Sequence, residues 1–181
     1  MKKMIIMTAI AALALTLVVA WSCAPPELSG SEGIEFTGCK LKVTEIDPKG
    51  GYEDLLSGDT VSPAQVTVDA TVALLPYCEG CSTDYCSDVN ITELTVSYSG
   101  TPGLSSWSQS VYEHMLVSET FTLTGIPLMP ERIKEQYNTS TTAAQQAVEN
   151  IYEVELEFEG ETDSGQDVSA TGTAWLSVKD N

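Results

Sequence analysis

The sequence is poor in the residues and motifs from which most enzyme sites are built. It contains one histidine, His114, so any site that requires two histidines is excluded. The chain also lacks a P-loop, a Gly-x-Gly-x-x-Gly run and a Gly-x-Ser-x-Gly turn, which are the signals of nucleotide binding and of α/β-hydrolase catalysis. We expect His114, in "SVYEHMLV", to be a surface or edge residue. The sequence therefore predicts a protein that is not an enzyme and needs no cofactor.

Basic residues are also scarce. The chain has 8 Lys and Arg against 26 Asp and Glu, a formal net charge of −18. A strongly negative protein repels the phosphates of nucleic acid and the headgroups of anionic lipid. The expected partners are therefore a protein or a cation, and nucleic acid is not among them.

The N-terminus has the pattern of a secretory signal peptide. Lys2 and Lys3 precede an apolar stretch from Ile5 to Ala20, which is the order of a signal sequence and is short for a membrane span. No later segment is apolar enough to cross a bilayer. Removing residues 1–22 leaves 6 basic and 26 acidic residues, a net charge of −20. About 150 residues then remain, which is enough for one domain with a core.

The end of this signal, "VVAWSC", places Ala20, Trp21 and Ser22 before Cys23. It resembles the lipobox of bacterial lipoproteins, whose cysteine receives a lipid and becomes the mature N-terminus. Ala20 stands where that family usually has Leu, and Trp21 is unusual; ordinary cleavage after Ala20 is the alternative. The resemblance implies lipidation at Cys23, and Ala24 would imply sorting to the outer membrane of a two-membrane bacterium, facing the periplasm or the cell surface.

Residues 23–33, including "APPELSGSEG", are rich in Pro, Gly and Ser and read as a flexible tether. Residues 34–181 show period-two alternation of apolar and polar side chains, interrupted by turn clusters, which predicts several short strands. We expect a single antiparallel β-sandwich that loosely resembles immunoglobulin-like or fibronectin-like domains. Pro130 and the Ala-rich run "TTAAQQAVEN" predict one or two short helices before a C-terminal hairpin. Five sets of alternating residues are expected to face the core. They are Cys39, Leu41 and Val43; Val66, Val68, Ala70, Val72 and Leu74; Leu94, Val96 and Tyr98; Phe121 and Leu123; and Tyr152, Val154, Leu156 and Phe158.

The C-terminal hairpin contains a strict alternation of glutamates with apolar residues. Pairing about a three-residue loop, Asp163-Ser164-Gly165, sets Phe158 opposite Ala170 and Leu156 opposite Gly172. Large side chains then meet small ones, so we expect an opposing layer to pack against them. The same register places Glu153, Glu155, Glu157 and Glu159 beside Trp175, Thr173, Thr171 and Ser169. This pattern favours a solvated face whose charge also opposes aggregation. Divalent cation binding is the alternative, although residues two apart are about 6.6–6.8 Å apart on a strand.

Five cysteines are present, and lipidation of Cys23 would leave an even number: Cys39, Cys78, Cys81 and Cys86. In an oxidising compartment these four are disulfide candidates. We expect one bridge from Cys39 to the cluster and a second inside it, Cys81–Cys86 or Cys78–Cys86. Alternatively, all four thiolates hold a metal ion, or Cys78-x-x-Cys81 is a redox pair.

The leading hypothesis is a non-enzymatic, lipid-anchored cell-envelope protein with a structural or interaction role. A metal or redox module based on the four cysteines is the second hypothesis. A calcium- or carbohydrate-binding domain is the third, with Trp107, Tyr112 and Trp175 as the candidate stacking residues.

Overall fold

The computed structural model describes residues 39–54, 56–57, 60–61, 65–76, 83 and 86–179. The signal peptide, Cys23 and the tether lie outside the described residues. In the described part of the chain, no helix is both long and apolar enough to cross a membrane. The elements are β1 (Cys39–Asp47), β2 (Gly50–Asp54), β3 (Leu56–Ser57), β4 (Thr60–Val61), β5 (Thr67–Pro76), β6 (Val89–Ser99), β7 (Trp107–Met115), β8 (Thr120–Pro127), α2 (Glu131–Ser140), α3 (Ala143–Gln146), β9 (Asn150–Thr162) and β10 (Asp167–Lys179).

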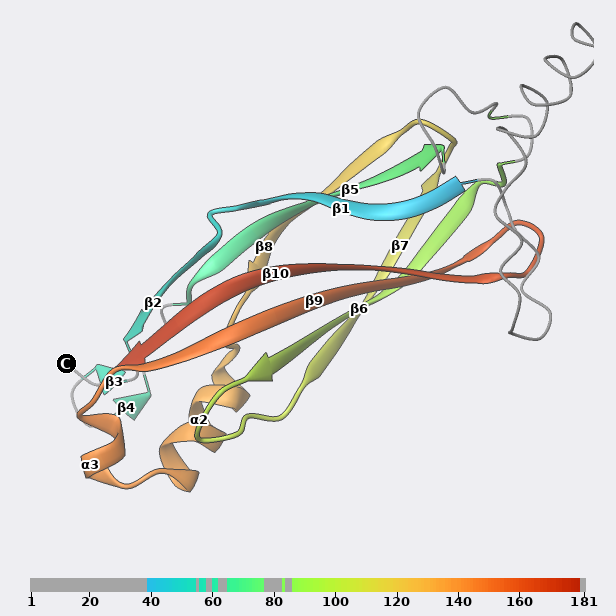
Figure 1. The fold of residues 1–181 in the computed structure, drawn as a ribbon. Coiled ribbons are helices and arrows are strands. Elements are labelled where there is room, and N and C mark those ends of the chain that lie inside the picture. Colours follow the sequence, from blue (N-terminus) through green and yellow to red (C-terminus); the bar gives the residue numbers. More distant parts are fainter. Residues whose placement is uncertain are drawn as a thin grey trace, which may run out of the picture.

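Two sheets pack face to face, so the predicted β-sandwich is confirmed (Figure 1). One sheet has the order β1-β5-β8, and the other has the order β2-β10-β9-β6-β7. Strands β3 and β4 form a small separate ribbon. The two predicted short helices, α2 and α3, precede the β9–β10 hairpin and lie at the end of the sandwich opposite its turn (Figure 1).

One strand pair departs from the antiparallel arrangement that the sequence predicts. Strand β2 pairs with β10 in parallel, with Trp175 opposite Gly50 and Ser177 opposite Tyr52. The chain leaves β1 at the edge of the three-stranded sheet and enters β2 at the edge of the five-stranded sheet without reversing its direction (Figure 1). A connection that keeps its direction cannot form a hairpin, so β2 meets β10 in parallel.

The C-terminal hairpin has the predicted register. Phe158 pairs with Ala170 and Leu156 with Gly172, and Gly165 takes the left-handed conformation at φ 84°. A Cβ on Gly172 would come within 2.7 Å of Val43 and 2.9 Å of Ile46 on β1. The small residues of β10 therefore leave room for the opposite sheet, as the large-to-small pairing predicts.

The core lies between the sheets and contains most of the predicted inward residues. Leu41, Val68, Ala70, Val72, Leu74, Leu94, Val96, Tyr152, Val154, Leu156 and Phe158 are all buried. Cys39, Val43, Val66, Tyr98, Phe121 and Leu123 are partly buried against this cluster. Irregularities between Val43 and Glu45 and between Val68 and Ala70 interrupt the pairing of β1, β5 and β8. In the sequence, the parity of the apolar residues switches between Phe36 and Cys39, which predicts a bulge at Gly38; this position lies outside the described residues.

The helices close one end of the sandwich, which we call the helix end. Pro130 precedes the first residue of α2, and Thr142 forms a capping box with Gln145 at the start of α3, which satisfies backbone donors of this short helix. Lys134 of α2 is fully buried and its Nζ lies 2.6 Å from Oε1 of the buried Glu53 on β2. The other carboxylate oxygen of Glu53 accepts a hydrogen bond from the backbone N–H of Val66. This buried ion pair joins the helix to the edge of the five-stranded sheet.

Candidate functional site

The outer face of the five-stranded sheet is acidic along its middle strand. Glu153, Glu155, Glu157, Glu159 and Glu161 of β9 point outward, and we call them the glutamate row; all are exposed except the half-buried Glu157. Side chains two apart on a strand are about 6.6–6.8 Å apart, so the row is roughly 27 Å long. It provides an extended strip of negative charge.

Hydroxyl groups and further carboxylates flank the glutamate row on both sides. On β10 the opposite residues are Thr173, Thr171, Ser169 and Asp167, as the predicted register requires. On β6 they are Ser97, Thr95 and Glu93, so Glu93 and Glu159 lie directly opposite one another. No Lys or Arg occupies the outward positions of β6 or β9, or of β10 between Asp167 and Trp175. The charge of this described surface is therefore of one sign.

A pocket of about 470 Å³ lies at one end of this strip. Its lining is Thr92, Glu159, Gly160, Glu161, Asp167, Val168 and Ser169. Three of these residues carry carboxylates, which come from both strands of the hairpin. The pocket therefore suits a positively charged group better than a neutral or negative one.

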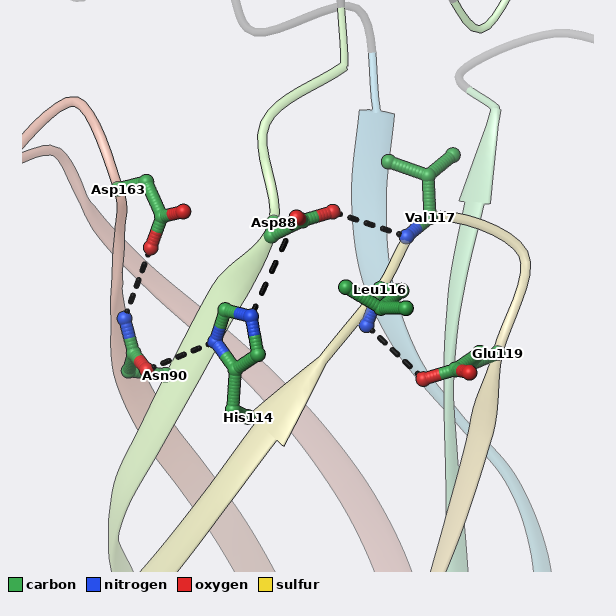
Figure 2. A network of polar contacts seen from close by, with 7 residues as sticks. All are labelled: Asp88, Asn90, His114, Leu116, Val117, Glu119 and Asp163. Carbon is green, nitrogen blue, oxygen red and sulfur yellow. Dashed lines mark hydrogen bonds and ion pairs between the residues drawn. The ribbon is translucent and has the colours of Figure 1, made fainter.

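A second polar group, which we call the histidine cluster, consists of Asp88, Asn90, His114 and Asp163 (Figure 2). Asp88 precedes β6, His114 lies near the end of β7, and Asp163 begins the turn between β9 and β10. One ligand atom from each of Asp88, His114 and Asp163 lies within 4.8 Å of the others. We call this end of the sandwich the turn end.

Hydrogen bonds fix the side chains of the histidine cluster. The amide nitrogen of Asn90 donates to Oδ1 of Asp163 at 3.0 Å, and its oxygen lies 2.9 Å from Nδ1 of His114. Oδ1 of Asp88 accepts from the backbone N–H of Val117 at 3.2 Å. Nε2 of His114 lies 4.0 Å from Oδ2 of Asp88, with the two side chains 48% and 32% exposed. The cluster is therefore ordered yet open to solvent.

The structure confirms one of the predicted disulfides. Cys39 at the start of β1 bonds to Cys86, with a Cα–Cα distance of 5.1 Å and a sequence separation of 47. In the chain-entropy model, a loop of this length stabilises the fold by about 4 kcal/mol. Cys86 is therefore not available to Cys78 or Cys81, which corrects the second bridge that the sequence favours.

The same bond is incompatible with the alternative of four thiolates on one metal ion. Sulfurs that are joined to one another cannot act as separate thiolate ligands. Cys23, Cys78 and Cys81 lie outside the described residues, so lipidation and the redox pair stay predictions.

The structure does not bring the candidate aromatic residues together. Trp107 is in the core, whereas Tyr112 is 87% exposed and Trp175 is 48% exposed. Trp175 pairs with Glu153, which pairs in turn with Ser99 at the end of β6. Tyr112 lies on β7 opposite the irregularity between Ile91 and Glu93 of β6. These two positions are near opposite ends of β6. The described surface therefore lacks a joint stacking platform from these three residues.

Sequence reasoning missed the histidine cluster because its members are far apart along the chain. His114 was correctly placed at the surface of an edge strand, β7. Asp88 lies in the stretch Thr83 to Asn90, which lacks the residue spacing of an EF-hand calcium loop, so the sequence alone does not indicate a site there. The available signal is the pairing of Asn90 with His114, which requires the register of β6 against β7. Only the predicted β9–β10 turn fixed one member, Asp163, in advance.

Comparisons with known proteins add no assignment to this chain. No family model matches it, and the search of curated proteins found no match. Among solved structures, it is similar to the solution structure of a protein described as late embryogenesis abundant (LEA). That similarity has 12% sequence identity and a TM-score of 0.40, and covers 97% of this chain and 87% of the other. At this level it carries no functional argument.

Proposed function

We propose that this chain is a non-enzymatic cell-envelope protein, lipid-anchored through Cys23, whose acidic sheet face binds a cationic partner. The observation that carries the proposal is the glutamate row, flanked by hydroxyls and further carboxylates without an intervening Lys or Arg. A partner with regularly spaced positive charges complements this face, and such complementarity favours rapid and selective association.

The cross-strand pair Glu93–Glu159 supports a binding role over simple solvation. Like charges directly opposite one another on antiparallel strands destabilise a sheet. Hydroxyl residues at these positions would keep the face equally soluble without that repulsion. A bound cation would remove the repulsion, so binding energy is available at this point of the sheet.

An extended basic peptide fits the dimensions of the strip. A row of roughly 27 Å corresponds to about eight residues of extended chain. Lysines two residues apart would project at the same period as the glutamates. We therefore propose a basic segment of another protein as the partner.

The test is the binding of a ten-residue peptide of alternating Lys and Ala by fluorescence anisotropy, from 20 to 300 mM salt. We expect salt-dependent binding that weakens at least tenfold in the variant with Glu155→Gln, Glu157→Gln and Glu159→Gln. The matched control removes three exposed carboxylates away from this face, with Glu45→Gln, Glu131→Gln and Glu135→Gln, and should bind within twofold of the original. Equal weakening in both variants would reduce the effect to net charge and contradict the proposal.

The anchor has a separate test. Expression of the full chain in a bacterial host should place it in the membrane fraction, with an acylated Cys23 in the mass spectrum. Cys23→Ala should release the protein from that fraction. Membrane association that persists in this variant, or a mature N-terminus at Trp21, would contradict lipidation.

A further inference from the structure

We propose that Asp88, His114 and Asp163 form a site for a divalent transition-metal ion of the zinc class. The site lies at the turn end, outside the glutamate row, and does not depend on the partner proposed above. Its ligands come from three segments, and their ligand atoms lie within 4.8 Å of one another. Figure 2 shows the three side chains turned toward a common space.

The imidazole of His114 is held in a form that can bind a metal. The amide nitrogen of Asn90 is the only group on that side chain that can donate to Asp163, so its oxygen faces His114. An amide oxygen only accepts hydrogen bonds, so Nδ1 of His114 carries the proton. In the neutral ring, Nε2 then has the unshared electron pair. A hydrogen bond from the other ring nitrogen is the usual support of a metal-binding histidine.

Each aspartate has one oxygen engaged and leaves the other for a ligand. Oδ1 of Asp88 accepts from Val117, and Oδ1 of Asp163 accepts from Asn90. The backbone N–H of Asp163 also donates to the carbonyl of Asp88 at 3.0 Å, which holds the two acids next to each other. Neither carboxylate forms an ion pair with a Lys or Arg of the described chain.

The distances suit a small ion after a modest closure. Zinc lies about 2.0–2.2 Å from nitrogen and carboxylate oxygen, so two tetrahedral ligands are about 3.4 Å apart. Nε2 of His114 and Oδ2 of Asp88 are 4.0 Å apart, and both side chains are partly exposed and can move by the difference. Water would complete the coordination.

The ligand types set the class of metal. An imidazole nitrogen with carboxylates suits zinc and its neighbours, such as cobalt and nickel, whereas calcium takes six to eight oxygen ligands. The alternative to metal binding is an ion pair in which Nε2 of His114 donates toward Asp88. Adding metal while the ring nitrogens of His114 are observed separates these two possibilities.

The chain contains one histidine, so a long-range ¹H–¹⁵N spectrum of the tag-free full chain reports His114 alone. Before metal is added, we expect Nδ1 to carry a proton. Addition of Zn²⁺ should shift Nε2 with a stoichiometry of one, and a chelator should reverse the shift. Zinc bound elsewhere, at Cys78 and Cys81 for example, would leave the ring unchanged and overturn the proposal.

Calorimetry with Zn²⁺ and variants provides the second readout. His114→Gln and Asp163→Asn each remove a proposed ligand and should weaken binding at least about 10–100-fold, because loss of a group that only supports a ligand already costs that much. The matched control, Asp54→Asn, makes the same change at an exposed position of β2, outside the cluster and the acidic face, and should bind within twofold of the original.

Two outcomes contradict the assignment. Equal weakening by Asp54→Asn and Asp163→Asn would mean diffuse attraction to the net negative charge of the protein. If Ca²⁺ binds as tightly as Zn²⁺, His114 is not a ligand of the site. If His114→Gln does not fold, His114→Asn serves in its place, with the thermal melt as the check of folding.

Discussion

The two ends of the sandwich differ in whether their charged side chains are buried and paired or open to solvent. At the helix end, Lys134 and Glu53 are buried and paired, and the described helices and strands exclude water from them. At the turn end, the half-buried Asp88 and the exposed Asp163 are held near each other, and neither has a Lys or Arg partner among the described residues. The first arrangement fixes the fold, and the second leaves charge available to a ligand.

Tyrosine hydroxyl groups reinforce the helix end. Tyr98 donates to the carbonyl of Leu128 at 2.7 Å and accepts from the indole of Trp107 at 3.0 Å, and Tyr152 donates to Pro102 at 2.8 Å. The ring of Tyr152 meets those of Tyr98 and Tyr137 edge to face. Among the described residues, the buried polar side chains at this end have partners inside the protein, as a stable interior requires.

The largest effect is expected from the buried ion pair. Lys134→Met leaves the Glu53 carboxylate buried without its cation, and removal of one partner of such a pair costs about 3–5 kcal/mol. The measurement is urea unfolding at pH 7. The corresponding change at the turn end, Asp163→Asn, should cost less than about 1 kcal/mol, because exposed charges contribute little.

A double variant separates the charge from the packing. Lys134→Met with Glu53→Gln removes both charges and keeps an oxygen that can accept from Val66. It should recover most of the lost stability. If the double variant is as unstable as Lys134→Met alone, the loss comes from packing or from other contacts of Lys134, and the comparison of the two ends fails.

A smaller effect is expected in alkali. Burial raises the pKa of Tyr98, Tyr137 and Tyr152 above the ordinary value of 10.0, and the neighbouring Tyr137 raises that of Tyr152 further. The hydrogen bond from Trp107 opposes the shift at Tyr98 without cancelling it. Above pH 10 the unfolded chain therefore releases protons that the folded chain retains.

The stability that these tyrosines contribute is fully present below about pH 10 and falls as the pH rises above it. The slope is at most about 1.4 kcal/mol per pH unit for each tyrosine. Urea unfolding from pH 9 to 11.5 measures it, and Tyr152→Phe should make the slope shallower. An unchanged slope in this variant would assign alkaline unfolding to groups other than Tyr152.

The smallest effect is expected at the Glu93–Glu159 pair of the acidic face. Glu93→Gln removes the repulsion with Glu159 and should stabilise the fold by about 0.2–1 kcal/mol at low salt. The gain should shrink in 0.5 M salt because surface charges are screened. Glu45→Gln on the exposed part of β1 is the control, and an equal gain there would reduce the effect to net charge.

The hairpin shows which parts of the fold can be predicted from sequence. Its register follows from local information, because the period-two pattern and the three-residue turn with Gly165 specify the same pairing. The small residue Gly172 even indicated that the opposite sheet packs there, which Val43 and Ile46 do. The parallel pairing of β2 could not be predicted, since no local pattern indicates that a chain crosses between sheets without a turn.

The histidine cluster shows which part of a site could not be predicted from the sequence. Asp163 was placed by its turn, but its approach to Asp88 and His114 depends on how β6 pairs with both β7 and β9. Both pairings contain an irregularity between Ile91 and Glu93, which shifts the facing residues. A side-chain constellation built across such irregular pairs needs coordinates.

The disulfide has a mechanical consequence for a chain held at its N-terminus. A pull applied ahead of Cys39 enters the domain at the first residue of β1. There the covalent bond to Cys86 passes the load to the chain that leads into β6, the strand between β9 and β7. The disulfide thus carries tension to an inner strand of the larger sheet, and the hydrogen bonds between β1 and β5 are not broken one after another.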